Sequence, residues 1–202
     1  MCTAVNKSEK ITNMKYETSL ISRRHLLQSF AATSTFLAPN YLNANTFLNG
    51  PNDIRRIKMY SLRSGESIDM IYWIEGKYIK DALTEVDWFM RDLRKNESYE
   101  IDTRTIDIIS ATQRVLDTQS PLHLLSGYRT KSTNKLLRSR LGGGVAKKSL
   151  HLLGQAADIS MPGRTVNQVA RAAAKCAGGG VGKYSRSQFV HIDCGEIRVW
   201  GE

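Results

Sequence analysis

Two histidine–aspartate pairs in the second half of the chain are candidate metal ligands. The first is in SLHLLGQAADIS, where His151 stands seven positions before Asp158. The second is in SQFVHIDCG, where Asp193 follows His191 by two positions. Imidazole nitrogens and carboxylate oxygens are ligands of catalytic zinc, which takes three protein ligands and leaves a fourth position for water. By residue type, the two segments together could supply such a site.

The first pair can share a metal only if the chain turns back between its two members. An extended strand would separate His151 and Asp158 by more than about 20 Å at ~3.3 Å per residue. Gly154 lies between them and, lacking a Cβ, can adopt the backbone conformations of a tight reversal. Ala156 and Ala157 follow and make a thin strand that can pack closely. We therefore predict a reversal at Gly154.

The second pair is typical of one face of a buried strand. Side chains alternate between two faces in FVHID, so His191 and Asp193 point the same way. A single histidine in an apolar strand is more often a hydrogen-bonded structural residue than a ligand. Here, two of the three histidines outside the N-terminal segment are each set beside an aspartate in an apolar strand. This recurrence favours a metal site.

Most of the elements that must position these residues are predicted by hydrophobic periodicity. Alternating apolar residues across RSGES predict a β-hairpin over 57–72. Helical spacing of apolar residues predicts amphipathic helices over 79–93 and 108–116. LHLLSGYR, residues 122–129, is typical of a strand that runs into a loop, and a short basic helix is expected over 131–140.

The remaining elements lead into and out of the histidine motifs. LGGG at 141–144 predicts a flexible loop, and Thr165 with Gln168 predicts a capping box that begins a helix. Strands are expected at about 188–193 and 196–200. Because helices come first and the motif-bearing strands later, we predict an α+β fold, in which a small antiparallel sheet carrying the zinc site packs against helices.

The N-terminal segment has the layout of an export signal. SRRHLLQSFAATSTFLAPNYLNANT contains the pair Arg23–Arg24, a mildly apolar stretch and then small polar residues, which is typical of a twin-arginine signal peptide. A short amphipathic surface helix is the alternative. We predict a signal peptide over 1–44, a linker over 45–53 and one domain over 54–202, and hence a periplasmic protein.

Composition narrows the possible partners. The chain has 29 basic and 19 acidic residues, and loss of residues 1–44 would remove five basic and two acidic ones, leaving 24 and 17, a net charge of +7. This excess is spread along the chain, so no nucleic-acid partner is indicated. No apolar run approaches the ~20 residues that span a bilayer, so no stable membrane span is expected. Cys176 and Cys194 could form a disulfide after export, or remain two buried thiols.

A family resemblance rests on the first histidine motif. SLHLLGQAAD matches the pattern S-x-H-x-x-G-x-A-x-D at every specified position, namely Ser149, His151, Gly154, Ala156 and Asp158. In this it resembles the zinc peptidases related to D-Ala-D-Ala carboxypeptidases and dipeptidases. SGYRT before it and GGGVGKYSRSQFVHIDCGEIRVW after it resemble the murein endopeptidase K (YcbK-like) branch, so the likeness covers roughly 54–202.

The resemblance implies Zn²⁺ bound by His151, Asp158 and His191, and hydrolysis of peptide cross-links in peptidoglycan. The carboxypeptidase and dipeptidase relatives carry a glutamate general base three residues before the last histidine, where this chain has Gln188. An amide cannot take up a proton. By strand geometry Asp193 is the best candidate for the base, although it could instead orient a ligand histidine.

Three further residues are candidates for the site. The guanidinium of Arg129, after the SGY turn, suits an oxyanion or a substrate carboxylate, so Arg129 is both a catalytic and a substrate-binding candidate. Its alternative is a solvated loop arginine. Ser149 could hold its loop or donate a hydrogen bond to the substrate. His123 is a further candidate, for which a packed strand histidine is the alternative.

The function expected from these residues is a periplasmic zinc-dependent murein endopeptidase that acts on stem peptides. Two alternatives stay open. The same fold could act as a D,D-carboxypeptidase or dipeptidase on peptide ends. It could also be a non-catalytic wall-binding module that keeps zinc and has lost its base, as Gln188 allows.

Overall fold

A computed structural model describes residues 54–140 and 145–201 of the chain. The predicted signal peptide at 1–44, the linker at 45–53 and the loop at 141–144 lie outside the described residues. The boundaries of the domain stay a prediction. Among the described residues, no helix is both long enough and apolar enough to cross a membrane.

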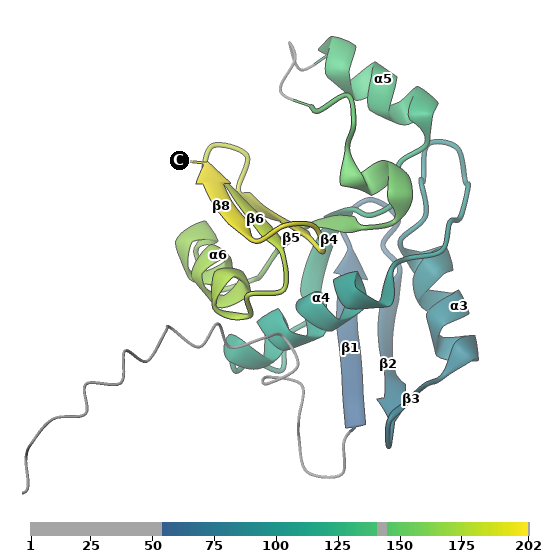
Figure 1. Ribbon diagram of the computed structural model, residues 1–202, viewed down its shortest axis with the longest axis vertical. Helices are drawn as coiled ribbons and strands as arrows, with labels where there is room; N and C mark the ends of the chain where they lie inside the picture. Colours follow the sequence, from purple (N-terminus) through teal and green to yellow (C-terminus); the bar gives the residue numbers. More distant parts are fainter. Residues whose placement is uncertain (1–53, 141–144, 202) are drawn as a thin grey trace, which may run out of the picture. The chain divides into compact units, whose positions relative to one another are not determined.

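The described chain forms one eight-stranded sheet with helices packed against it (Figure 1). The strand order is β3-β2-β1-β4-β5-β7-β6-β8. The strands are β1 Ile54–Ser61, β2 Ser67–Ile74, β3 Lys77–Tyr78, β4 Leu122–Ser126, β5 Ala156–Ser160, β6 Gly180–Tyr184, β7 Phe189–Asp193 and β8 Arg198–Gly201. The helices are α3 Lys80–Phe89, α4 Thr103–Val115, α5 Lys131–Arg140, the 3₁₀ turn η2 Leu150–Leu153, and α6 Val166–Lys175.

The predicted α+β class is confirmed, and the sheet is larger than the small antiparallel one expected. The pairs β4–β5, β5–β7 and β6–β7 are antiparallel, whereas β1–β4 and β6–β8 are parallel. A parallel pair needs a crossover through intervening elements, and local periodicity carries no signal for it. The parallel β1–β4 pair joins the N-terminal hairpin to the strands that bear the motifs.

The N-terminal hairpin is confirmed, and its alternation continues into the core. β1 and β2 pair antiparallel with Ile57 opposite Met70. Ile57 and Met59 are fully buried. Helix α3 packs on β2, α4 on β1 and β7, and α6 on β6 and β7. One apolar core therefore lies between the sheet and these helices.

Helix boundaries differ from the prediction where capping decides them. Asp102 caps α4 by accepting the Arg104 backbone N–H, so this helix begins five residues before the predicted start at 108. The segment after Phe89 leaves α3 and forms a loop that includes the bridge between Asp92 and Glu97. The capping box of Thr165 and Gln168 is confirmed at the start of α6.

Candidate metal centre

Antiparallel pairing of β5 and β7 brings together two of the three predicted ligands. The register places Asp158 directly opposite His191. Directly opposed residues in an antiparallel pair share one face with their Cβ atoms roughly 5 Å apart. A one-residue slip of either strand would turn one of the two side chains to the other face.

The third ligand is brought back by the reversal predicted at Gly154. His151 lies in η2, and Gly154 ends this turn with φ 66°, in the left-handed region that favours glycine. A Cβ at Gly154 would also collide with the backbone carbonyl of Glu100. The chain then enters β5, in which Ala156 and Ala157 are fully buried.

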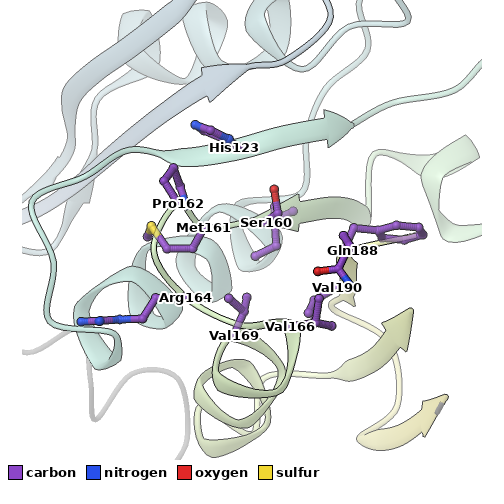
Figure 2. Close-up of a pocket in the computed structure, with 11 residues that line it drawn as sticks. His123, Ser160, Met161, Pro162, Arg164, Val166, Val169, Gln188 and Val190 are labelled. Atoms are coloured by element: carbon purple, nitrogen blue, oxygen red, sulfur yellow. The ribbon is translucent and has the colours of Figure 1, made fainter. Parts of the chain in front are cut away.

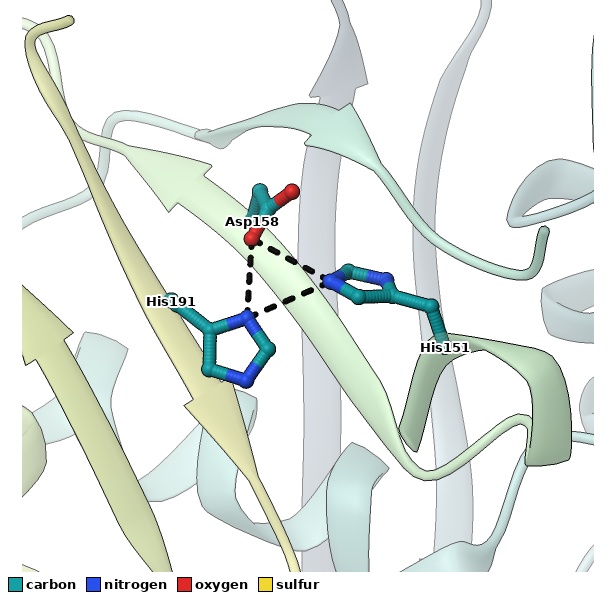
Figure 3. Close-up of side chains that lie close together, drawn as sticks. All are labelled: His151, Asp158 and His191. Carbon is teal, nitrogen blue, oxygen red and sulfur yellow. Dashed lines mark hydrogen bonds and ion pairs between the residues drawn. The ribbon is translucent and has the colours of Figure 1, made fainter. Parts of the chain in front are cut away.

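His151, Asp158 and His191 converge on one point (Figure 3). Nε2 of His151 lies 3.2 Å from Nδ1 of His191 and 3.3 Å from Oδ1 of Asp158. Nδ1 of His191 lies 3.0 Å from Oδ1 of Asp158. Tetrahedral zinc with bonds of ~2.0–2.1 Å would hold its ligand atoms about 3.3 Å apart. The chemistry and the spacing of these donor atoms fit such an ion.

Each histidine is oriented by a hydrogen bond on its other nitrogen. Nδ1 of His151 donates to the Gly127 carbonyl at 2.7 Å, since a carbonyl can only accept. Nε2 of His191 lies 3.1 Å from Oδ2 of Asp193. These bonds leave the Nε2 lone pair of His151 and the Nδ1 lone pair of His191 facing Asp158. Orientation by a carbonyl or a carboxylate is usual for histidines that bind metal.

Asp158 divides its two oxygens between the histidines and Arg129. Oδ1 faces the two imidazoles, and Oδ2 accepts from a guanidinium N–H of Arg129. Burial alone would raise the pKa of Asp158, but the hydrogen bond with protonated His191 and the charge of Arg129 outweigh it and hold that pKa well below its usual range. The carboxylate is therefore ionised at neutral pH.

The pKa values of the two histidines are shifted in opposite directions. Burial lowers the pKa of His151, whose ring is almost completely inaccessible. Burial also lowers the pKa of His191, but the carboxylates of Asp158 and Asp193 outweigh it and raise that pKa. A metal at this site therefore meets a neutral His151, and it competes with a proton at His191.

Asp193 shares the face of His191, as predicted, but lies at the edge of the imidazole away from Asp158. Its side chain is 0 % exposed. Besides His191, it accepts from the backbone N–H groups of Gly180 and Gly195 and from the guanidinium of Arg198. Burial raises its pKa, but the hydrogen bonds with His191, Gly195 and Arg198 lower it to about 2. Of the two roles left open by the sequence, this position favours orientation of His191 over proton transfer.

Gln188 does not face the candidate metal centre. It lies in the turn between β6 and β7 at φ 56°, is exposed, and donates to the Ser185 carbonyl. With Val190 it lines a separate pocket of about 220 Å³ (Figure 2). His123 lines the same pocket and packs against Tyr60 with ring centroids 5.4 Å apart, as the packed alternative predicts.

The three candidate ligand residues line a cleft of about 620 Å³. Ser149 and Arg129 both line it, so two candidates for substrate contact lie beside the three ligands. The cleft also has charged residues that the sequence did not suggest, namely Arg63, Arg94, Lys148 and Arg198. They come from distant segments, so no local pattern marks them. Cys176 and Cys194 are both free and buried, which matches the second alternative considered for them.

Comparison with known proteins gives one consistent family. The family model described as peptidoglycan L,D-endopeptidase MepK matches residues 50–200. The chain is 41% identical over 146 residues to the peptidoglycan L,D-endopeptidase MepK of Escherichia coli K12, covering 72% of this chain and 80% of that protein. It is 31% identical over 147 residues to the probable peptidoglycan L,D-endopeptidase MepK of Haemophilus influenzae, covering 72% and 78%.

Proposed function

The chain belongs to the MepK family of peptidoglycan L,D-endopeptidases, and on that premise we propose that it hydrolyses L,D peptide cross-links of peptidoglycan with a zinc ion held by His151, Asp158 and His191. One observation carries the zinc proposal. Two imidazole lone pairs and one carboxylate oxygen face one another at 3.0–3.3 Å beside an open cleft. Lone pairs at such distances repel unless a proton or a cation lies between them.

Each residue of the centre has a distinct role in this proposal. Bound zinc would supply a Lewis acid and a water whose pKa is lowered to about 7. Asp193 keeps the proton on Nε2 of His191, which leaves Nδ1 free as a ligand. Arg129 holds Asp158 and lines the cleft, so its permanent charge can stabilise the oxyanion that forms on the scissile carbonyl.

No side-chain carboxylate of the cleft is placed to take the proton of the attacking water and pass it to the leaving amine. Among the described residues that line the cleft, the carboxylates are Asp158 and Asp193. Asp158 is engaged by the histidines and Arg129, and Asp193 is fully buried behind His191. We therefore expect solvent in the cleft to accept the proton and deliver it to the leaving amine. A pH–rate profile without an acidic limb from a carboxylate base would agree with this assignment.

Digestion of purified sacculi tests the function. The expected result is hydrolysis of cross-linked dimers to monomers, identified by product mass. Activity should be lost in chelator and recovered on addition of zinc. Release of only terminal D-alanine would support the carboxypeptidase alternative. Zinc binding with retention on sacculi and no cleavage would support the wall-binding module.

We also propose that the protein is exported to the periplasm, because its peptidoglycan substrate lies there. The Arg23–Arg24 pair favours the twin-arginine route. Replacing both arginines with lysine should leave uncleaved precursor in the cytoplasm. Undiminished export of that variant would exclude the twin-arginine route.

A further inference from the structure

The cleft beside the metal centre carries more positive charge than its own carboxylates can balance. Five cationic side chains line it: Arg63, Arg94, Arg129, Lys148 and Arg198. Asp158 pairs with Arg129, and Asp193 pairs with Arg198. Within residues 54–140 and 145–201, no carboxylate forms an ion pair with the other three. The substrate must therefore bring negative charge if the cleft is to be neutralised.

Arg63 is an exposed residue that lines the cleft and is held there by the end of β4. It lies in the turn between β1 and β2, and its Nε donates to the Leu125 carbonyl at 2.9 Å. The next residue, Ser126, accepts from Nε of Arg129 at 2.8 Å. Two guanidiniums are thus fixed by neighbouring residues of one strand, and one of them touches the ligand Asp158.

Asp92 anchors the backbone of Arg94, whose exposed side chain lines the same cleft. The Asp92 carboxylate accepts the backbone N–H of Arg94 at 3.0 Å and both the N–H and the hydroxyl of Thr130, at 2.9 and 2.8 Å. Thr130 directly follows Arg129, so the loop after α3 is fastened where Arg129 enters the site. Burial, and then the charges of Arg94 and Arg129, lower the pKa of Arg63, and they outweigh the opposing effect of the Asp158 carboxylate, with which Arg63 forms no ion pair.

The guanidiniums of Arg63 and Arg94, which have no carboxylate partner among the described residues, suit a substrate carboxylate, because a planar guanidinium can donate parallel hydrogen bonds to both carboxylate oxygens. Cross-links formed through an amino group of a diamino diacid place such a carboxylate on the carbon that bears the scissile amide nitrogen. We propose that Arg63 and Arg94 bind this carboxylate and select cross-links that carry it. The proposal rests on the endopeptidase function proposed above, and it adds the recognition of the substrate.

The test uses three synthetic cross-linked peptide dimers. The first has all carboxylates free. In the second, the carboxylate on the carbon that bears the scissile nitrogen is converted to an amide. In the third, only the C-terminal carboxylate is converted to an amide. Loss of a charged hydrogen-bonded contact typically changes binding by about 10- to 100-fold. We expect kcat/KM of the wild type to be lower on the second dimer by about that factor and nearly unchanged on the third. The double variant Arg63→Gln/Arg94→Gln should lose the preference, mainly through KM.

Arg171→Gln is the matched control, since Arg171 is an exposed arginine of α6 outside the cleft, and it should keep the preference. A wild type that cuts the first two dimers equally overturns the proposal, as does a double variant that loses the same factor on both. A preference that follows the C-terminal carboxylate instead overturns it in favour of that source.

Absence of any cleavage by the wild type would count against the proposed function alone. Recognition would then be judged by calorimetry on the His151→Ala protein. In that protein the free dimer must bind more tightly than the dimer amidated beside the scissile nitrogen, and the two arginine changes must remove the difference. Equal binding of both dimers would overturn the recognition proposal whatever the activity.

Discussion

Two buried aspartates, Asp107 in α4 and Asp158 in β5, have similar surroundings in all but one respect. Each side chain is 8 % exposed, and each is paired with a buried arginine, Arg55 or Arg129. They differ in their remaining partners. Asp107 accepts from two tyrosine hydroxyls, whereas Asp158 faces two imidazole nitrogens.

The difference explains why one aspartate is structural and the other a candidate ligand. The hydroxyls of Tyr72 and Tyr78 are permanent donors at 2.8 Å, and Arg55 donates to the same carboxylate, so both oxygens of Asp107 are satisfied by the protein alone. At Asp158, the orienting bonds made by Gly127 and Asp193 turn lone pairs toward its carboxylate. Burial, a carboxylate and an arginine therefore do not define a metal site; the protonation state of the facing groups does.

The largest expected effect is loss of the metal at the Asp158 cluster. His151→Ala removes one of three ligands, so metal content should fall from about one ion per chain to near zero. Hydrolysis of sacculi should fall by at least about 10³-fold, because a Lewis acid is worth several kcal/mol. Elemental analysis and product release measure the two effects, and His123→Ala is the control that should keep both. Full metal in His151→Ala would remove this histidine from the ligand set.

The reciprocal change at the Asp107 cluster should reduce stability and leave the metal in place. Asp107→Ala leaves Arg55 buried without its partner, which typically costs about 3–5 kcal/mol of unfolding free energy. Urea unfolding of the metal-free protein measures this cost, and metal stoichiometry should stay near one. Asp69→Ala, at an exposed ion pair with Arg56, is the matched control and should cost less than about 1 kcal/mol. Loss of metal in Asp107→Ala would end the distinction between the two clusters.

An intermediate effect is expected where a carboxylate orients a ligand. Asp193→Asn should weaken zinc affinity by roughly 10- to 100-fold, and activity should return at saturating zinc. A rate that stays low, by about 10²-fold or more, with the site filled would instead make Asp193 the general base. Competition with a calibrated chelator measures the affinity.

The same aspartate gives a pH test in the metal-free protein. Its folded pKa of about 2 lies below the unfolded value of ~3.9, so its stabilising effect is complete above pH ~4. That effect is lost as pH falls through the folded pKa. The stability difference between wild type and Asp193→Asn should therefore shrink between about pH 4 and pH 2. A difference that stays constant over this range would contradict the assigned pKa.

The smallest effect is expected at Gln188. Gln188→Glu places a carboxylate in an exposed turn, beside a pocket separate from the cleft, so the rate of sacculus cleavage should change by less than about twofold. A gain of tenfold or more would mean that the turn moves to bring residue 188 to the metal.

Much of this protein follows from local sequence. Alternation over 57–72 gave the hairpin, and Thr165 with Gln168 gave the start of α6, because these patterns involve residues a few positions apart. The reversal at Gly154 follows from one residue that tolerates a positive φ. The ligand set came from the resemblance of the SLHLLGQAAD motif, and its three residues do meet in the fold.

Only the tertiary structure decided which polar groups face one another. The register of β5 against β7 sets Asp158 opposite His191, and long-range pairing leaves Asp193 behind that histidine rather than in the open cleft. Arg63 and Arg94 reach the cleft through contacts with β4 and with Thr130. Periodicity tells which face of its own element a residue occupies, but the partner across that face depends on strand register and loop closure, which involve residues far apart in the chain.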